Sequence, residues 1–304
     1  MKTKTKTDAY CGSLRWAVLL IAILLSMSLA EAAPKKVLVV TVTKGFRHSS
    51  IETAEKMLKE LGETSGAFTV DYARVEPNDE QYKGADGKKD NAKVDAAITA
   101  VLAEKMSPAA LQNYDAVIFA NTTGDLPLPD RDAFLDWVKS GKGFVGMHAA
   151  GDTFHGFPGY IDMLGAEFLK HEAQVEIDCI NQDTDFPACG HLGKDWKVYD
   201  EIYQFKNFHR PKVHGLLTLD TNPNHHEIAG DYPVAWCKEY GKGRVFYTSL
   251  GHREDLWDPN TPADFQRKNS PDVARAYQQH ILGGIKWALG LEPGNAKPQS
   301  TTAN

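Results

Sequence analysis

Apolar and amphipathic stretches alternate regularly through the first half of the chain. Four short segments rich in apolar and β-branched residues are typical of strands in a covered sheet, and they span residues 36–42, 68–72, 116–120 and 143–147. Between them, apolar side chains recur at helical spacing in residues 51–61, 92–104 and 129–140. Strands that alternate with helices across short loops predict an α/β fold with a parallel sheet and right-handed crossovers.

The second half is less regular and predicts mostly strands. These are residues 175–180, 201–206 and 213–219, then a pair at 234–238 and 244–249 around the turn at 240–243. A last helix begins at Ser270-Pro271 and ends before Gly290. We therefore expect one α/β domain over residues 34–291, with an irregular β-rich layer covering the active edge of the sheet, and a disordered tail over residues 292–304.

A histidine stands at the sharp turn that follows the strand at 143–147. Small residues surround it in Gly146-Met147-His148-Ala149-Ala150-Gly151, which is the steric pattern of a nucleophile elbow. An imidazole at that tip can act as a base, an acid or a ligand, but it replaces a thiol or hydroxyl nucleophile poorly. From this segment alone, a tight turn with an incidental histidine stays open as the alternative.

Polar side chains follow several of the predicted strands, and ligands of an open parallel sheet bind beyond the carboxyl ends of its strands. The candidate catalytic residues at this edge are His148 and His252. The candidate substrate-binding residues there are Thr43, Arg47, His48, Asn121, Asp152, His155 and Arg253. If the irregular half folds over the edge, Glu201 supplies a catalytic carboxylate beside His148, and His171 and Tyr203 join the substrate-binding set.

Motifs for cofactors are absent from the sequence. Neither G-x-x-x-x-G-K-[ST] nor G-x-G-x-x-G follows the first strand, so no nucleotide cofactor is expected. His48, His148, His171 and His252 could converge with Glu201 on a metal, but no H-x-x-x-H or H-x-H spacing brings two ligands together locally. We predict no cofactor and keep a divalent metal as the less favoured alternative.

The N-terminal segment resembles a secretory signal peptide. Three lysines and Arg15 precede an apolar run over residues 16–30, and Ala30-Glu31-Ala32 fits a small-x-small cleavage site. We expect cleavage near Ala32, export to the periplasm or beyond, and no membrane segment in the mature chain. Loss of four positive and two negative charges would change the net charge from −6 to −8, which argues against nucleic acid as a partner.

Export also bears on the cysteines, because an oxidising compartment permits disulfides. Cys179 and Cys189 flank a turn-rich segment, and Cys237 is the third cysteine of the mature chain. A local disulfide between Cys179 and Cys189 and three buried free thiols are both compatible with this spacing.

Several separated segments together resemble one family. They are residues 39–48, 143–150, Asp200-Glu201-Ile202-Tyr203, 233–236, 243–252 and 287–290. The chain is similar over about residues 35–291 to ThuA-like proteins, the trehalose-utilisation family, which implies a flavodoxin-like, class I glutamine amidotransferase-like fold. True amidotransferases carry Cys at the elbow tip where this chain and the family have His, so the resemblance implies no glutaminase activity. One departure is Gly190-His191-Leu192-Gly193, where the family often has His-Pro.

The resemblance also implies a role in sugar catabolism beside oxidoreductases that make 3-keto-glycosides. We expect an enzyme that cleaves or isomerises a glycoside or 3-keto-glycoside, with His148 or His252 as the base and Arg47 or His48 on the ketone oxygen. A sugar oxidoreductase that acts upstream is the expected functional partner, and no oligomeric state is predicted. A non-catalytic sugar-binding protein and a metal-dependent hydrolase are the alternatives.

Overall fold

The computed structural model describes residues 33–262 and 265–299. The predicted signal peptide, residues 1–32, lies outside the described residues. The elements below all belong to the compact unit that begins at Lys35. Among the described helices, none has the length and apolar character needed to cross a membrane.

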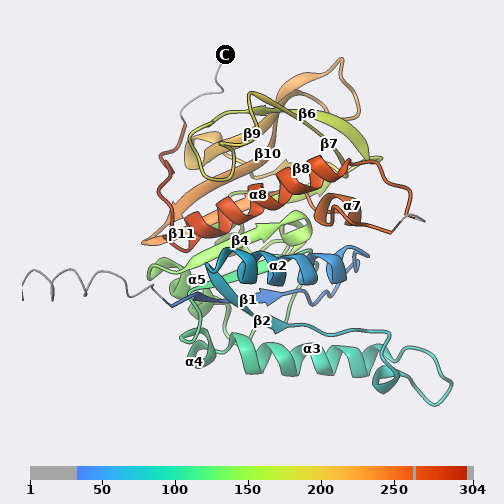
Figure 1. Cartoon of the computed structure of the whole chain (residues 1–304). Helices are drawn as coiled ribbons and strands as arrows, with labels where there is room; N and C mark the ends of the chain where they lie inside the picture. The colour runs from blue at the N-terminus through green and yellow to red at the C-terminus, as the bar shows by residue number, and fades with distance from the viewer. Residues whose placement is uncertain (1–32, 263–264, 300–304) are drawn as a thin grey trace, which may run out of the picture. The chain divides into compact units, whose positions relative to one another are not determined.

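A nine-stranded sheet in the order β2-β1-β3-β4-β11-β10-β9-β6-β7 runs through the molecule (Figure 1). Five neighbouring strands are parallel: β2 (Phe68–Ala73), β1 (Lys35–Val40), β3 (Ala116–Ala120), β4 (Gly143–Met147) and β11 (Gly243–Thr248). Antiparallel pairing then adds β10 (Ala229–Tyr240), β9 (His214–Thr221), β6 (Val175–Asn181) and β7 (Asp195–Asp200). The parallel half confirms the predicted α/β fold class.

Helices cover both faces of the parallel half. Helix α2 (Ile51–Ser65), α7 (Glu254–Trp257) and α8 (Pro271–Ala288) pack on one face. Helices α3 (Asn91–Met106), α4 (Pro108–Leu111), α5 (Arg131–Lys139) and α6 (Pro158–Leu164) pack on the other, and short 3-10 turns lie at Glu80–Tyr82, His148–Asp152 (η2) and Arg210–Lys212.

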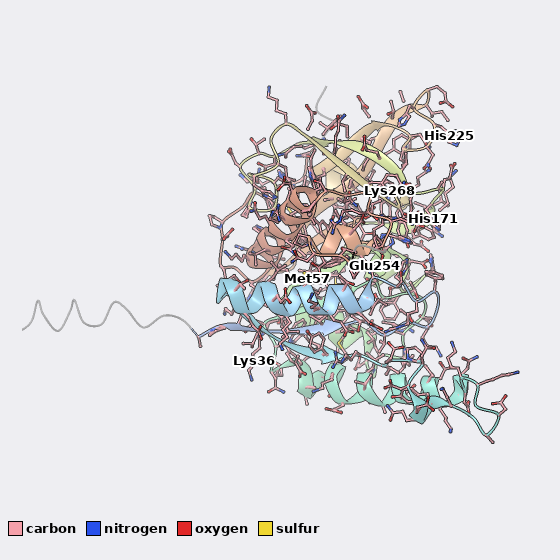
Figure 2. All side chains as sticks on the ribbon, turned by 45° about the vertical axis from the view of Figure 1, so that its right-hand side comes forward. Lys36, Met57, His171, His225, Glu254 and Lys268 are labelled. Carbon is pink, nitrogen blue, oxygen red and sulfur yellow. The ribbon has the colours of Figure 1, made fainter. Side chains whose placement is uncertain are left out.

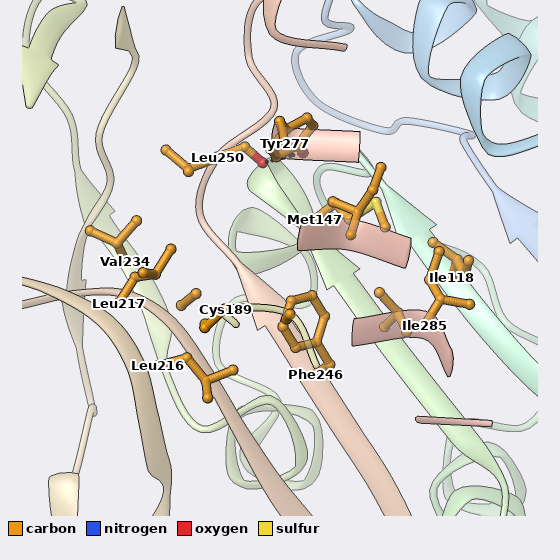
Figure 3. Close-up of a cluster of buried hydrophobic side chains, with 14 of the residues drawn as sticks. Ile118, Met147, Cys189, Leu216, Leu217, Val234, Phe246, Leu250, Tyr277 and Ile285 are labelled. Atoms are coloured by element: carbon orange, nitrogen blue, oxygen red, sulfur yellow. Dashed lines mark hydrogen bonds between the residues drawn. The ribbon is translucent and has the colours of Figure 1, made fainter. Parts of the chain in front are cut away.

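Successive residues of each parallel strand point into opposite cores, which explains why these strands are apolar throughout. Val37 and Val39 belong to the core under α2 and α8, whereas Leu38 and Val40 belong to the core under α3 and α5. Figure 3 shows part of the first core, with side chains of α8 such as Ile285 beside residues of β3, β4 and β11.

The covering layer differs in detail from the prediction. Of the five strands predicted for the second half, four belong to the central sheet, namely β11, β10, β9 and β6. The edge of β10 that faces away from β11 pairs with β9. The predicted strand at 201–206 is shorter, since β8 is Gln204–Lys206 and pairs with β5 (Glu167–Lys170) as a separate two-stranded ribbon. Strand β7 was not predicted. Residues 201–203 leave the sheet between β7 and β8.

The described part of the C-terminal tail makes ordered contacts, unlike the predicted disordered tail. The carbonyl oxygen of Lys297 lies 2.9 Å from Nδ1 of His214, and the amide of Gln299 donates to the carbonyl oxygen of Val213 at 3.1 Å. These contacts attach Lys297 and Gln299 to the start of β9, whereas residues 300–304 lie outside the description.

The three described cysteines are free and buried, which answers the question that their spacing left open. Burial raises the pKa of the Cys179 and Cys189 thiols well above the usual range. The local disulfide is therefore not formed in this structure.

Candidate active site: a histidine cluster at the carboxyl edge of the sheet

His148 directly follows β4 and is the first residue of η2, in a strained turn. Its φ is 45°, in the left-handed region that few side-chain-bearing residues adopt. The hydroxyl of Tyr247 donates to the carbonyl oxygen of His148 at 2.7 Å, and a Cβ at Gly146 would lie only 2.8 Å from the Tyr247 ring. The neighbouring strand β11 thus fixes the elbow, and the predicted sharp turn is present.

Three of the predicted histidines meet at this edge. The ring centroids of His48 and His148 are 4.8 Å apart, those of His48 and His252 are 5.1 Å apart, and those of His148 and His252 are 5.2 Å apart. The rings come from loops that follow β1, β4 and β11. Parallel strands end at a common edge, so residues about 100 to 200 positions apart in sequence become neighbours.

Glu201 enters the group from the residue after β7. Its Oε2 lies 3.3 Å from Nδ1 of His252 and 3.6 Å from Nε2 of His148, while its Oε1 lies 3.1 Å from Nδ1 of His171. The side chains of His48, His148, Glu201 and His252 are called the histidine cluster below.

The surroundings set the charge of the cluster. Burial, reinforced by charge on the neighbouring His148 and His252, lowers the pKa of His48 to about 2. Burial alone would raise the pKa of Glu201, but the neighbouring imidazoles of His148 and His252 outweigh burial and hold that pKa well below the usual range. Burial alone would lower the pKa of His252, but Glu201 and Asp200 raise it. His48 is therefore neutral, and Glu201 and Asp200 favour the protonated form of His252.

Asp200 positions the loop that carries His252. Its carboxylate is fully buried and accepts the amide of Gly251 at 2.7 Å and the amide of His252 at 3.3 Å. Sequence reasoning treated Asp200 only as the neighbour of Glu201. The sequence signal for Asp200 was the acidic pair Asp200-Glu201 itself, because successive side chains of an extended chain face opposite sides.

Asn121 is fully buried and connects the loop that follows β3 to the loops that contain Ser50 and Gly251. Its Nδ2 donates to Oγ of Ser50 at 2.9 Å and to the carbonyl oxygen of Gly251 at 3.2 Å. The Ser50 hydroxyl also donates to Gly251 at 3.1 Å instead of capping α2. The structure thus engages Asn121, predicted to bind substrate, in positioning the cluster.

Aromatic rings line one side of the cluster. The ring centroid of Tyr203 lies 4.4 Å from that of His148 and 4.3 Å from that of Phe168, and the His171 ring is stacked at 5.9 Å from Tyr203. His171 is partly exposed and lies on the same side of the molecule as His225 (Figure 2). Tyr203 and His171 therefore lie against the histidine cluster, on the side that the sequence suggested.

A polar cleft of about 680 Å³ opens beside His48. Thr43 and Arg47 line it, as do Ser49, Glu52, Glu76 and Asp95. Arg47 donates to Glu76 at 2.7 Å, and Thr43 forms an isolated parallel bridge with Thr123. The predicted residues Thr43 and Arg47 are thus part of the cleft wall and lie outside the cluster.

Asp152, His155 and Arg253 belong to other groups. His155 is hydrogen-bonded to Glu167 at 2.9 Å and to Asp152. Arg253 donates to the buried carboxylate of Asp255 at 2.9 Å. These three predicted substrate-binding side chains therefore have protein partners.

The cluster has the composition of a metal site. One nitrogen or oxygen atom from each of its four side chains lies within 4.8 Å of the others. Imidazole and carboxylate are common ligands of zinc and other divalent transition metals. The same atoms also suit general acid–base chemistry, in which a carboxylate orients an imidazole.

Comparison with known proteins agrees with the α/β fold. The family model for ThuA, described as trehalose utilisation, matches residues 36–268. A ThuA-like protein from Parabacteroides merdae is 20% identical with a TM-score of 0.59, and the match covers 84% of this chain and 90% of that one. One from Bacteroides uniformis is 18% identical with a TM-score of 0.58, covering 86% and 94%. These identities bear on the fold alone. No curated protein matches the chain.

Proposed function

The chain belongs to the ThuA family of trehalose utilisation, and on that premise we propose that it is an exported enzyme that cleaves or isomerises a glycoside or 3-keto-glycoside. The family description supports the carbohydrate as the substrate class. Export rests on the charged, apolar and small-residue pattern of residues 1–32.

One observation supports catalysis more than any other. The carboxylate of Glu201 lies 3.3 Å from a ring nitrogen of His252 and 3.6 Å from one of His148. An imidazole beside a carboxylate can take and return a proton within one binding event. The cleft beside His48 offers polar groups to sugar hydroxyls.

The proposed reaction on a 3-keto-glycoside is a β-elimination. The C3 ketone acidifies the C2 proton, and a base removes it. The C2–H electron pair forms the C1=C2 double bond, the bond from C1 to the aglycone oxygen breaks, and the proton goes to that oxygen. Addition of water across C1=C2 then places hydroxyl on C1 and hydrogen on C2, so the net change is hydrolysis.

His252 is the proposed proton carrier, because Glu201 stabilises its protonated form and its side chain is partly exposed. His148 is the second candidate, with its Nδ1 held by the carbonyl oxygen of Ser249 at 2.8 Å. His48 is neutral and can bind the ketone oxygen or another electronegative atom through a ring N–H. An oxidoreductase that converts the C3 hydroxyl to a ketone would supply the substrate.

Glutaminase chemistry is not proposed. The elbow tip is His148, and the cysteines at 179, 189 and 237 are buried thiols away from that tip in sequence. Acyl transfer from glutamine needs a thiolate or an equally strong nucleophile at the elbow.

The test incubates the mature protein with matched glycosides and 3-keto-glycosides in D2O. We expect product release and exchange of the C2 proton with solvent deuterium, both followed by NMR. Glu201→Gln and His148→Asn should slow both by about 10²–10⁴-fold, whereas His226→Asn, at an exposed residue, should leave both unchanged. Sugar binding without exchange or release would instead identify a sugar-binding protein.

A further inference from the structure

We propose that the histidine cluster is a binding site for one divalent transition-metal ion, with His148, His252, Glu201 and His48 as ligands. The donor atoms are already arranged around a common point, as their separations indicate. This inference goes beyond the proposed function, and metal binding can be measured whether or not the protein turns over a sugar.

Three donor atoms form a nearly regular triangle. Nε2 of His148 and Nδ1 of His252 are 3.3 Å apart, Nδ1 of His252 and Oε2 of Glu201 are 3.3 Å apart, and Nε2 of His148 and Oε2 of Glu201 are 3.6 Å apart. Ligands about 2.1 Å from a tetrahedral metal stand roughly 3.4 Å from one another. The triangle therefore has the size of one face of a metal's coordination shell.

His48 supplies the fourth donor. All four side chains place a donor atom within 4.8 Å of the others. His48 is 4% exposed, and its Nδ1 has no hydrogen-bond partner among the residues that the structure describes. A buried ring nitrogen without a partner is unfavourable, so a metal ion bound there would supply the partner that the described residues do not.

Surrounding residues orient the ligands as they do in metal sites. Nδ1 of His148 donates to the carbonyl oxygen of Ser249 at 2.8 Å, which leaves Nε2 with its lone pair toward His252 and Glu201. Asp200 accepts the backbone amide of His252 and fixes the loop that carries it. Hydrogen bonds from the non-coordinating ring nitrogen to a carbonyl oxygen are usual around protein-bound metals.

The donor set selects the class of ion. Three imidazoles and one carboxylate suit Zn²⁺, Fe²⁺, Co²⁺ or Ni²⁺, whereas Mg²⁺ and Ca²⁺ prefer shells made of oxygen. The ion would lie beside the partly exposed side of His252, where a sugar oxygen can approach.

This site would change how the proposed reaction is divided among the residues, and only this consequence rests on the proposed function. The ion would supply the positive charge at the sugar oxygen. As ligands, His148 and His252 would no longer carry the proton. His171 would become the nearest free imidazole, because its Nδ1 lies 3.1 Å from the other oxygen of Glu201.

The test uses the full mature chain, stripped with a chelator and titrated with Zn²⁺ and, separately, Co²⁺. Calorimetry and elemental analysis should give about one ion per chain, and bound Co²⁺ should show the intense visible absorption of a four-coordinate site. Glu201→Gln and His252→Asn should each weaken binding by about 100-fold or more, since even residues that only support ligands alter affinity by about 10–100-fold. The control His226→Asn, outside the cluster, should bind as the unaltered chain does.

Two results would overturn the proposal: no stoichiometric binding by the stripped, folded chain, or equal affinity in the cluster variants and the control. Circular dichroism on each variant separates loss of ligands from loss of fold. A stripped chain that binds no ion on titration but turns over the sugar at an unchanged rate would overturn the metal site and leave the proposed function standing. An ion bound as expected in a chain without sugar turnover would do the reverse.

Discussion

The left-handed backbone of His148 predicts that glycine is tolerated at this position far better than at its neighbour. His148 has a φ of 45°, whereas Ala149 is not among the residues with positive φ, and both side chains are fully buried. The perturbation compares His148→Gly with His148→Ala, so that both variants lack the imidazole and differ by one methyl group. Ala149→Gly removes the same group from an unstrained position.

The expected free energies follow from three contributions. Removing a buried methyl group costs about 0.8 kcal/mol, and the added freedom of glycine in the unfolded chain costs about 0.5–1 kcal/mol. Ala149→Gly should therefore destabilise the fold by about 1.5 kcal/mol. At position 148, relief of the left-handed backbone returns about 1–2 kcal/mol, so the Gly and Ala variants should agree within about 0.5 kcal/mol.

Urea denaturation measures the free energy of unfolding for each chain, provided that the slope with urea stays the same. If His148→Gly lies below His148→Ala by as much as Ala149→Gly lies below the unaltered chain, the turn stores no strain and the reasoning fails. Both His148 variants should also lose turnover by about 10²–10⁴-fold. The strained turn would then be retained for catalysis at the expense of stability.

Three further predictions concern other parts of the chain. His280 is buried between Ala188 and Thr248, and burial lowers its pKa to about 4. The unfolded chain, with a pKa of about 6.5, takes up a proton that the folded chain refuses, so the free energy of unfolding should fall by about 2 kcal/mol more between pH 7 and pH 5 than in His280→Gln. The buried thiols Cys179 and Cys189 should react with a thiol reagent only as fast as the chain opens; immediate reaction in the folded state would contradict their burial. Exported protein should begin near residue 33, and N-terminal sequencing that finds the intact start would exclude cleavage.

The parallel half of the fold could be predicted because its signals are local. Segments such as residues 116–120 are apolar on both faces, and only a doubly covered strand has that requirement. Strand β7 was missed, and its true partner β6 lies across a turn-rich segment. Beyond β11, the pairs β11–β10, β10–β9 and β6–β7 join consecutive strands, whereas the pair β9–β6 joins strands separated by two others, and periodicity does not encode that choice.

The histidines of the cluster could also be placed from local signals, because each follows a parallel strand and parallel strands end at one edge of the sheet. Glu201 was a conditional inference, because it directly follows β7, a strand that the sequence pattern did not predict.

The polar residues at the same edge separate according to a property that composition cannot reveal. A buried polar atom is stable only with a partner, which is either a protein group or a ligand. Arg253 has a protein partner in Asp255, so it shapes the edge. Asn121 is mixed, because its Nδ2 donates to Gly251 whereas its Oδ1 has no partner among the described residues. His48 retains a ring nitrogen without one among the described residues. Partner assignment across the fold, more than residue type, therefore distinguishes a ligand-binding side chain from a structural one at this edge.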